Sequence, residues 1–412
     1  MRRGRGGGQP LHSGAMGSLP AIDSLDVSGR RVFVRCDLNV PIADGVIGDD
    51  LRIRAAVPTL KALLERGARL VVCSHLGRPQ GKVVEELRLA PVGERLSELL
   101  GIEVESLDEV VGERAAAACR SNARVVLLEN LRFEPGEESN DPALADALAS
   151  LADAYVDDAF GAAHRAHASI VGVPERLPAA AGYLLAEEVT KLEALLHDAE
   201  SPYVAVLGGA KVSDKLGVIG SLLDRVDAFC IGGAMAFTLL VARGHEVGRS
   251  LVERDRIDEV RGVLEAADAK GVAIHLPLDV VAADAPTSEA PHGTVTLDEI
   301  GDRMGVDIGP ATAERFTDVI EEARTVLWNG PMGIFEIEPY SHGTRAVAQA
   351  IARATGKGAY TVAGGGDSAA ALAQLKMTEA VSHLSTGGGA SLELLEGREL
   401  PGVAILRKEG AR

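Results

Sequence analysis

Short apolar runs alternate with amphipathic segments along most of this chain, and that alternation restricts the fold more than any other feature of the sequence. The apolar runs are rich in valine and end in glycine or polar turns, as buried strands do. The predicted strands are 31–38, 69–76, 124–130, 154–160, 203–210, 228–233, 272–283, 325–331, 359–366 and 381–389. Amphipathic helices are predicted among them at 55–67, 89–101 and 142–152. Repeated strand–helix–strand order predicts parallel sheets with right-handed crossovers.

The series of strands is interrupted once, by a long helical segment at 181–200 that ends at Ser201–Pro202. A chain of 412 residues is long enough for two domains. We therefore expect two Rossmann-like, three-layer α/β/α domains with parallel sheets, joined by this segment as a hinge helix. The predicted boundaries are 19–180 for the first domain, 201–390 for the second and 391–412 for a C-terminal tail.

Residues 1–18 read MRRGRGGGQPLHSGAMGS, which is rich in glycine and arginine and has no apolar period. Because it lacks an apolar central region, this segment does not resemble a secretory signal peptide. We expect a disordered extension, left over from cloning or from an upstream start, with Met16 as an alternative first residue.

The formal net charge of −18 argues against binding to nucleic acids or to anionic membranes. The chain has no run of 18 apolar residues, so no transmembrane helix is expected. Its cysteines are scattered and form no CxxC pair, which favours free thiols in a reducing cytoplasm over disulfides or a metal site. They are Cys36, Cys73, Cys119 and Cys230.

In the first half of the chain, cationic and hydrogen-bonding residues follow the predicted strands. They occur in RCDLNVP, DDLRIRAAVP, SHLGRP, ENLRF and FGAAHRAHAS. The residues concerned are Asp37, Asn39, Arg52, His75, Arg78, Arg132, His164, Arg165 and His167. A surface ion pair would explain any one of the arginines. Four at strand ends, in so acidic a protein, predict a site for a phosphate or carboxylate ligand, because the planar guanidinium binds such groups through two oxygens.

The second half has glycine-rich turns after its strands, in GGAKVSDK, GGAMAF, GVDIGP, NGPMGIFE, GGGDS and STGGGAS. Such turns present backbone N–H groups to a polyphosphate and its nucleoside. In GGAKVSDK, Lys211 and Lys215 are four residues apart, so on a helix they would lie on one face and reach the same anion. Asp367, which directly follows three glycines, is placed to bind a phosphate-bound Mg²⁺. A single turn of this kind could equally serve helix packing.

The motifs of several phosphate-binding classes are absent. ATGKGAY and GRPQGKVV lack the Ser or Thr of a Walker A loop, and no HRD or DFG set of a protein kinase occurs. A nicotinamide-dependent dehydrogenase is disfavoured because no GxGxxG follows the first strand of either half. A non-catalytic nucleotide-binding scaffold with the same fold remains the alternative to an enzyme.

Eight segments resemble the signature segments of the phosphoglycerate kinase family, in the family's order: RCDLNVP, SHLGRP, ENLRF, FGAAHRAHAS, GGAKVSDK, WNGPMGIFE, GGGDS and STGGGASLELLEG. The resemblance runs from about residue 22 to residue 406. It implies Mg²⁺-dependent phosphoryl transfer between 1,3-bisphosphoglycerate and ADP, giving 3-phosphoglycerate and ATP. It also implies a monomer, and a C-terminal tail that returns to the first domain.

The resemblance further assigns roles to residues of this chain. It implies a 3-phosphoglycerate site made of Asp37, Asn39, Arg52, His75, Arg78, Arg132 and Arg165. It implies a nucleotide site made of Lys215, Gly305, Glu336, Gly365, Gly366, Asp367 and Ser368, in which Glu336 contacts the ribose and Asp367 the metal. Lys211 and Arg52 would approach the transferred phosphoryl group from opposite domains, with Lys215 as a third catalytic residue. The chain departs from the family pattern at Ser368, where threonine is common, and the hydroxyl is retained.

Overall fold

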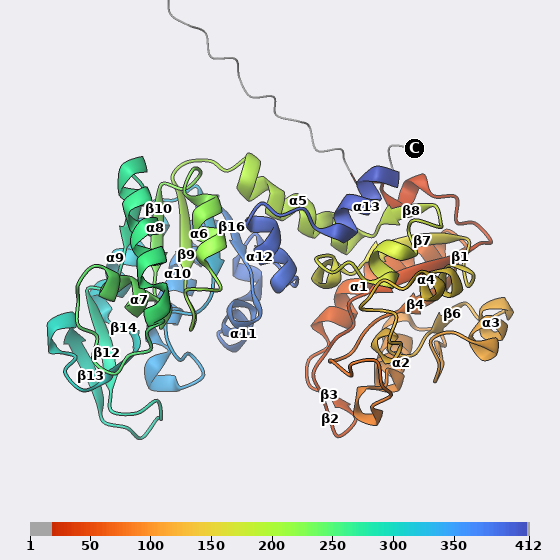
Figure 1. Ribbon diagram of the computed structural model, residues 1–412, viewed down its shortest axis with the longest axis horizontal. Coiled ribbons are helices and arrows are strands. Elements are labelled where there is room, and N and C mark those ends of the chain that lie inside the picture. Colours follow the sequence, from red (N-terminus) through yellow and green to blue (C-terminus); the bar gives the residue numbers. More distant parts are fainter. Residues whose placement is uncertain (1–18, 410–412) are drawn as a thin grey trace, which may run out of the picture.

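The computed structural model describes residues 19–409 and consists of two lobes, each built around a six-stranded parallel sheet (Figure 1). The predicted fold class, two parallel-sheet α/β domains of Rossmann type joined by a helix, is confirmed. The predicted disordered extension at 1–18 and the last residues of the predicted tail, 410–412, lie outside the described residues.

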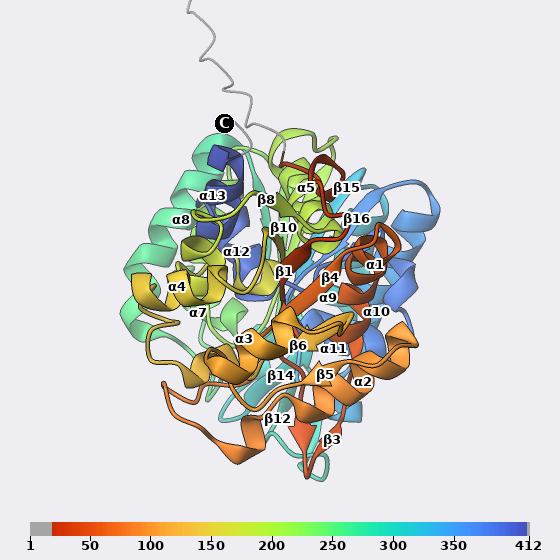
Figure 2. The same cartoon turned by 90° about the vertical axis from the view of Figure 1, so that its right-hand side faces the viewer.

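The first sheet has helices on both faces because alternate residues of its strands enter two separate apolar clusters. In β1, Phe33 belongs to one cluster, and Val32 and Val34 belong to the other. Figure 2 looks onto this lobe, with α4 and α13 on one side of the sheet and α1 and α2 on the other. Across the sheet the strands are β5 (Glu105–Ser106), β6 (Val125–Leu127), β4 (Arg69–Cys73), β1 (Arg31–Cys36), β7 (Ala154–Asp158) and β8 (Ala179–Ala181). The helices are α1 (Leu51–Glu65), α2 (Ala90–Leu100), α3 (Glu113–Arg120), α4 (Pro142–Ala149) and α13 (Pro401–Glu409).

The second sheet follows the strand order of doubly wound nucleotide-binding folds, in which successive strands are added first on one side of the first strand and then on its other side. Here that reversal lies between β9 and β15, and ligands of such sheets bind beyond the carboxyl ends of the strands at this point. Across the sheet the strands are β11 (Ala273–His275), β10 (Ala228–Ile231), β9 (Tyr203–Leu207), β15 (Thr325–Asn329), β16 (Tyr360–Ala363) and β17 (His383–Leu384). The helices are α6 (Leu216–Leu222), α7 (Met235–Ala242), α8 (Ile257–Lys270), α9 (Pro310–Glu321), α10 (His342–Gly356), α11 (Gly366–Gln374) and α12 (Gly389–Leu395).

The prediction of one strand over 272–283 is wrong. The segment forms β11 and then β12 (Asp279–Ala283), which belong to different sheets. Pro277 lies between them, and it can neither donate to a ladder nor continue a central strand. The β12 strand pairs antiparallel with β13 (His292–Thr296) and β14 (Met304–Ile308), so the second lobe also carries a small antiparallel sheet that the strand–helix pattern did not predict.

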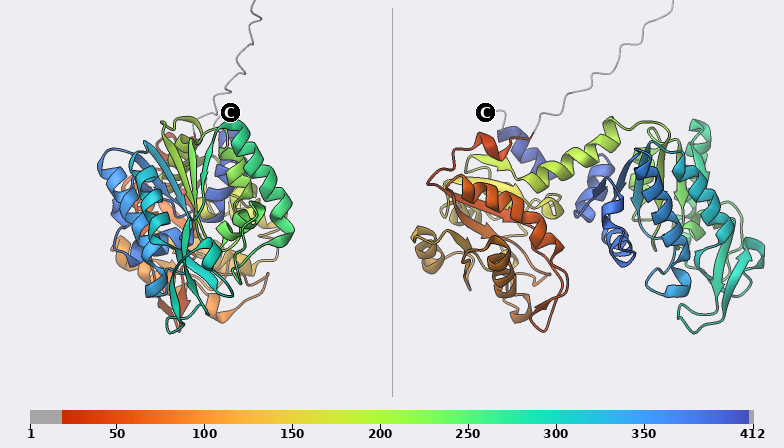
Figure 3. Two further views of the ribbon diagram at one scale, coloured as in Figure 1. Left: turned by 90° about the vertical axis from the view of Figure 1, so that its left-hand side faces the viewer. Right: turned by 180° about the vertical axis from the view of Figure 1, so that it is seen from behind.

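The helix that joins the lobes is shorter than the predicted 181–200. The α5 helix spans Tyr183–His197, because Ala181 is still paired in β8 and Gly182 is the N-cap residue. Figure 3 shows α5 running from one lobe to the other. Its buried face is part of a single apolar cluster that reaches both sheets. The residues of that face are Leu185, Val189, Leu192 and Leu195.

The C-terminal segment returns to the first lobe after α12. The α13 helix contacts β8 and a π-helical turn, η5 (Ala168–Gly172), and the Gly402 N–H donates to the Ala163 carbonyl at 2.9 Å. The chain therefore passes between the two lobes once through α5 and once through the residues before α13. The division into units at 180, 200 and 390 stays a proposal.

Asp158 caps the start of α5 and gives folding a pH dependence. Its Oδ1 accepts from the Leu184 N–H at 2.9 Å, and burial raises the pKa of Asp158 to about 7. The folded protein thus binds this proton more tightly than the unfolded chain, and stability falls as pH rises from about 4 to about 8. Asp158→Asn keeps the Oδ1 acceptor but cannot titrate. We expect it to reduce the pH-dependent loss of the free energy of unfolding by up to about 4 kcal/mol.

Calorimetric Tm values at pH 5 and pH 8 measure this effect. The exposed Asp153 provides the matched control, Asp153→Asn. Burial also raises the pKa of the neighbouring Asp157, to about 6, and its charge raises the pKa of Asp158. The difference between the variant and the parent protein therefore reports the loss of the Asp158 charge together with its effect on Asp157. Equal loss of Tm in Asp158→Asn and the parent would contradict the prediction.

Candidate functional site

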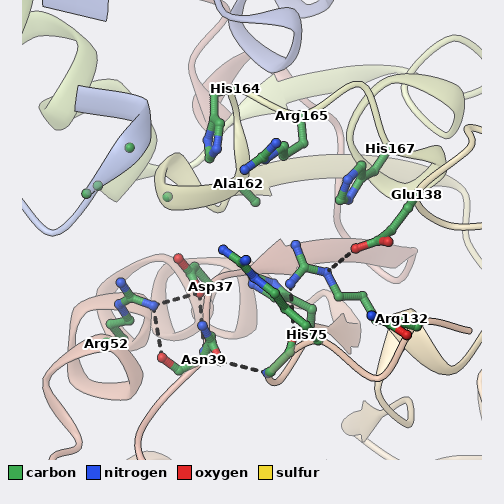
Figure 4. Close-up of a pocket in the computed structure, with 17 residues that line it drawn as sticks. Asp37, Asn39, Arg52, His75, Arg132, Glu138, Ala162, His164, Arg165 and His167 are labelled. Carbon is green, nitrogen blue, oxygen red and sulfur yellow. Dashed lines mark hydrogen bonds and ion pairs between the residues drawn. The ribbon is translucent and has the colours of Figure 1, made fainter. Parts of the chain in front are cut away.

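A cavity of about 700 Å³ lies beyond the carboxyl ends of β1, β4 and β7 in the first lobe, and it collects the predicted cationic residues (Figure 4). Figure 4 shows the loop of His164, Arg165 and His167 facing Asp37, Asn39 and Arg52 across this space. All seven residues expected in the 3-phosphoglycerate site line the cavity: Asp37, Asn39, Arg52, His75, Arg78, Arg132 and Arg165.

Asp37 and Asn39 hold one wall of the cavity together. The Arg52 guanidinium, in the first turn of α1, donates to the Asn39 carbonyl at 2.9 Å and lies 3.5 Å from the Asp37 carboxylate. The Asn39 side-chain oxygen accepts from the Gly77 N–H at 3.0 Å, which connects the loops after β1 and β4. Arg52 is therefore oriented by two groups that follow β1 and keeps donors free for a ligand.

Arg132 is fixed by the turn that follows β6. Asn130 caps this turn, because its side-chain oxygen accepts from the Arg132 N–H at 3.1 Å and its amide donates to the Leu76 carbonyl at 2.8 Å. The Arg132 guanidinium donates to the Gly77 carbonyl at 2.7 Å and lies 3.2 Å from the Glu138 carboxylate. The loops after neighbouring strands thus direct the guanidinium groups of Arg52 and Arg132 into the same cavity.

The cavity carries an excess of positive charge. Within residues 19–409, Arg78 and Arg165 are exposed and have no carboxylate partner, whereas Asp37 and Glu138 are the carboxylates that line the space. Burial, together with the nearby guanidinium of Arg35, holds the pKa of His75 well below its ordinary value, so this ring is neutral at pH 7. An anionic ligand would compensate the arginines.

The two predicted lysines of the second lobe line one cavity of about 380 Å³, but not for the predicted reason. Lys211 and Lys215 do not share a helix face, because α6 begins only at Leu216. Glu253 accepts from the Ser213 N–H and hydroxyl at 3.0 and 2.7 Å, and the Lys215 N–H bonds the Val212 carbonyl at 2.9 Å. These bonds hold a turn, and the turn brings both ammonium groups to the cavity.

Asn329, at the end of β15, belongs to this cavity and was not predicted from the sequence. Its Oδ1 accepts from the Lys215 ammonium, and its buried Nδ2 has no protein partner. Burial also lowers the pKa of Lys215. The backbones after β9 and β15 touch here, since a Cβ on Gly330 would lie 2.2 Å from the Gly208 carbonyl. Asn329 is the first residue of NGPMG, and its place at the end of a strand was the signal available in the sequence.

The N-terminus of α11 points into the same cavity and supplies unpaired backbone donors at Gly365, Gly366 and Asp367. Ser368 is buried beside them, and its hydroxyl oxygen accepts from the Gly330 N–H at 2.7 Å. Asp367 is exposed and makes no ion pair within residues 19–409. No group of three or more potential ligand side chains for a metal occurs in that range. A single free carboxylate fits Mg²⁺, which takes one or two carboxylates and completes its shell with phosphate oxygens and water.

A third cavity of about 400 Å³ adjoins the lysine cavity and shares Gly209, Ala210 and Asp367 with it. It is mostly apolar, and Gly305 and the exposed Glu336 line it as predicted for a nucleoside site. A Cβ at position 305 would lie 2.0 Å from the Phe237 ring, so a larger residue there would require this ring to move.

The loop before α12 joins the cavities of the two lobes. Gly388 and Gly389 line both the cationic cavity and the lysine cavity. Gly388 also lines a smaller space of about 450 Å³ that Arg52 shares with Gly365 and Gly366. The sequence predicts this loop as a phosphate-binding glycine turn and as a signature segment, but it does not reveal that the loop reaches the first lobe.

Comparison with known proteins agrees with this arrangement. A family model described as phosphoglycerate kinase matches residues 22–398. A phosphoglycerate kinase of Thermomicrobium roseum is 54% identical over 95% of this chain and 100% of its own length. That of Salinispora tropica is 55% identical over 94% of this chain and 99% of its own length. The solved structure of phosphoglycerate kinase from Coxiella burnetii is 41% identical, with a TM-score of 0.85, and covers 95% of this chain and 99% of its own.

The fold, the facing cavities and these relatives define a two-domain kinase that acts on small molecules. The chain belongs to the phosphoglycerate kinase family.

Proposed function

We propose that this enzyme catalyses the reversible transfer of a phosphoryl group from 1,3-bisphosphoglycerate to ADP, giving 3-phosphoglycerate and ATP, as a step of glycolysis. The observation that carries the proposal is the continuous series of cavities that share Gly388, Gly389 and Asp367. A triose acid at one end and a nucleotide at the other would meet at the lysine cavity. A non-catalytic scaffold would have no use for Arg52, Lys211, Lys215 and Asp367 in this arrangement, and the relatives do not favour it.

In this proposal the cationic cavity binds 3-phosphoglycerate through the seven residues named above. The α11 N-terminus and Lys215 bind the nucleotide phosphates, Gly305 lies near the adenosine, and Glu336 binds the ribose. The position of the Lys215 ammonium supports its role. Lys215 contacts Asn329 and lines the cavity in front of the α11 N-terminus.

Phosphoryl transfer has a loose, in-line transition state with charge on three equatorial oxygens. The carboxylate of 3-phosphoglycerate is already ionised when it attacks ATP, so no general base is required. The protein therefore contributes positioning and charge neutralisation. Lys211 on one lobe and Arg52 on the other are the cations proposed to neutralise the group in transfer.

The free carboxylate of Asp367 would hold Mg²⁺ against the nucleotide phosphates. When bound, the ion neutralises phosphate charge and orients the transferred group. Asp367 is suited to this because it lines both the lysine cavity and the nucleoside cavity.

A coupled assay tests the proposed function. Mg-ATP and 3-phosphoglycerate are supplied, and NADH consumption is followed through glyceraldehyde-3-phosphate dehydrogenase. We expect turnover of about 1–100 s⁻¹ or more, abolished by EDTA and restored by excess Mg²⁺. Absence of turnover in protein that still binds ATP would favour the scaffold or a different acid substrate.

Domain closure is expected because the two sites lie on separate lobes joined by α5. Closure brings the reactants into line and keeps water from the acyl phosphate. We predict a smaller radius of gyration by small-angle X-ray scattering for the complex with 3-phosphoglycerate and a non-transferable ATP analogue than for the free enzyme. Each ligand alone is the control, and identical radii in all states would count against closure.

We further propose that the enzyme acts as a monomer in the cytoplasm. All four cysteines are buried free thiols, as suits a reducing compartment. No helix in the described part of the chain has the length and apolar character needed to cross a membrane.

A further inference from the structure

A buried chain of hydrogen bonds lies directly behind the cationic cavity. It runs from Glu137 through Ser169 and Arg35 to His75, and all four side chains are buried. Arg35 comes from β1 and is 0% exposed, so it cannot itself contact a ligand. Arg35 opens the segment RCDLNVP, but its place inside β1 gave no indication that it contacts His75.

The direction of each bond in this chain is fixed by the donors available. The Ser169 hydroxyl has one proton and gives it to Glu137 Oε1 at 2.6 Å, while the Ser169 N–H donates to Oε2 at 3.0 Å. The hydroxyl oxygen is then an acceptor, and Arg35 Nε donates to it at 2.9 Å. Arg35 is thus connected to the buried carboxylate through Ser169, its Nη1 donates to the Cys36 carbonyl, and its Nη2 is directed at His75.

That nitrogen determines where the His75 ring carries its proton. Arg35 Nη2 lies 3.2 Å from His75 Nδ1. A guanidinium has only donors, so Nδ1 must present its lone pair. Nδ1 carries a proton in the Nδ1–H tautomer and in the imidazolium. In both forms that proton would point at the Arg35 N–H and repel it. The single proton of the neutral ring therefore sits on Nε2.

The Nε2 atom faces the cavity. His75 lines the space, and its Nε2 makes no hydrogen bond to the protein within residues 19–409. Nε2 is nevertheless not one of the fully buried side-chain atoms that lack a hydrogen-bond partner. It therefore contacts solvent in the cavity, where it offers an N–H.

We infer that Arg35 is a positioning residue that locks His75 in the Nε2–H tautomer, so that the ring serves as a neutral hydrogen-bond donor to an anionic oxygen of the ligand. The identity of that ligand as 3-phosphoglycerate rests on the proposed function. The locked ring recognises a carboxylate or phosphate oxygen and offers no acceptor to a ligand hydroxyl.

Nitrogen-15 NMR of the full-length enzyme, labelled at histidine, tests the tautomer directly. Long-range proton–nitrogen correlations at pH 7 distinguish a protonated Nε2 from a protonated Nδ1, and His75→Gln assigns the signal by its loss. We expect Nε2–H with a bare Nδ1. A protonated Nδ1, or exchange between both forms, overturns the inference even if the enzyme is fully active.

Arg35→Lys tests the positioning role. Lysine keeps the positive charge beside Glu137 but cannot reach Ser169 and His75 together. We expect the KM for 3-phosphoglycerate to rise about tenfold, as for loss of one hydrogen bond to a charged group, with the KM for ATP unchanged and a mixture of His75 tautomers in the NMR spectrum. The matched control is Arg31→Lys, at the start of the same strand.

A folded Arg35→Lys enzyme with an unchanged KM for 3-phosphoglycerate and an unchanged His75 spectrum overturns the positioning role. If the variant does not fold, the spectrum of the unaltered enzyme still decides the tautomer. Ser169→Ala, which removes the acceptor of Arg35 Nε, then replaces Arg35→Lys in the kinetic test. Failure of the proposed function is distinguishable, because it would appear as absence of turnover in the unaltered enzyme.

Discussion

Lys211→Ala is expected to lower kcat by about 10²–10³-fold, the loss typical of one preorganised donor at a developing charge. Lys211 follows the glycine turn after β9, is exposed, and makes no ion pair in the described part of the chain. Its ammonium is therefore free for a ligand in the cavity it shares with Lys215 and Asp367. The KM for ATP should change less, since Lys215 and the α11 N-terminus remain.

The coupled assay measures this loss, with Lys270→Ala as the control. Lys270 is also an exposed lysine of the second lobe, but it pairs with Asp224 at the surface, far along the chain from the glycine turn. Turnover close to that of the unaltered enzyme in Lys211→Ala would refute its assigned role.

Arg52→Ala is expected to cause a loss of similar size, about 10²–10³-fold in kcat, from the other lobe. The guanidinium is oriented by the Asn39 carbonyl and the Asp37 carboxylate, and it lines both the cationic cavity and the space that reaches Gly365. It is thus a cation of the first lobe placed where the nucleotide phosphates would arrive. Removing it leaves the transferred group neutralised from one side only.

The control for Arg52 lies two residues further along the same helix. Arg54→Ala removes an arginine that pairs with Asp50 at the surface, at 3.0 Å, so it should leave kcat unchanged. Equal kinetics for Arg52→Ala and Arg54→Ala would exclude a special role for Arg52. If Arg52 and Lys211 act on one phosphoryl group, the double variant should lose less than the product of the single losses.

The positions of functional residues at strand ends were largely predictable from the sequence. Parallel strands bring their carboxyl ends to one edge, so His75, Arg132 and Arg165 could be expected together although they lie on different segments. The structure places each predicted residue in one of the connected cavities. Their roles in binding and catalysis remain proposals, to be decided by the variants above.

Predictions from local sequence patterns were wrong where tertiary contacts determine the backbone conformation. The spacing of Lys211 and Lys215 fits a helix. Glu253, about 40 residues later, instead accepts two hydrogen bonds from Ser213, and these stabilise a turn. The apolar run 272–283 fits one strand by composition, yet Pro277 divides it between two sheets.

The contacts of Asn329, Gly388 and Arg35 were not predicted because their partners are remote in sequence. Asn329 contacts Lys215, Gly388 reaches across to the cavity of the first lobe, and Arg35 contacts His75 and Ser169 from inside a strand. None of these contacts leaves a periodic or compositional signal, so a single sequence does not reveal them.

The return of α13 to the first lobe has a consequence for synthesis on the ribosome. The first lobe is translated early, but the helix that packs on β8 and η5 and bonds Ala163 is made from residues 401–409. The second lobe, in contrast, is one uninterrupted stretch that can fold as it emerges. The first lobe is therefore completed only after the second lobe has been translated, although most of the first lobe is made earlier.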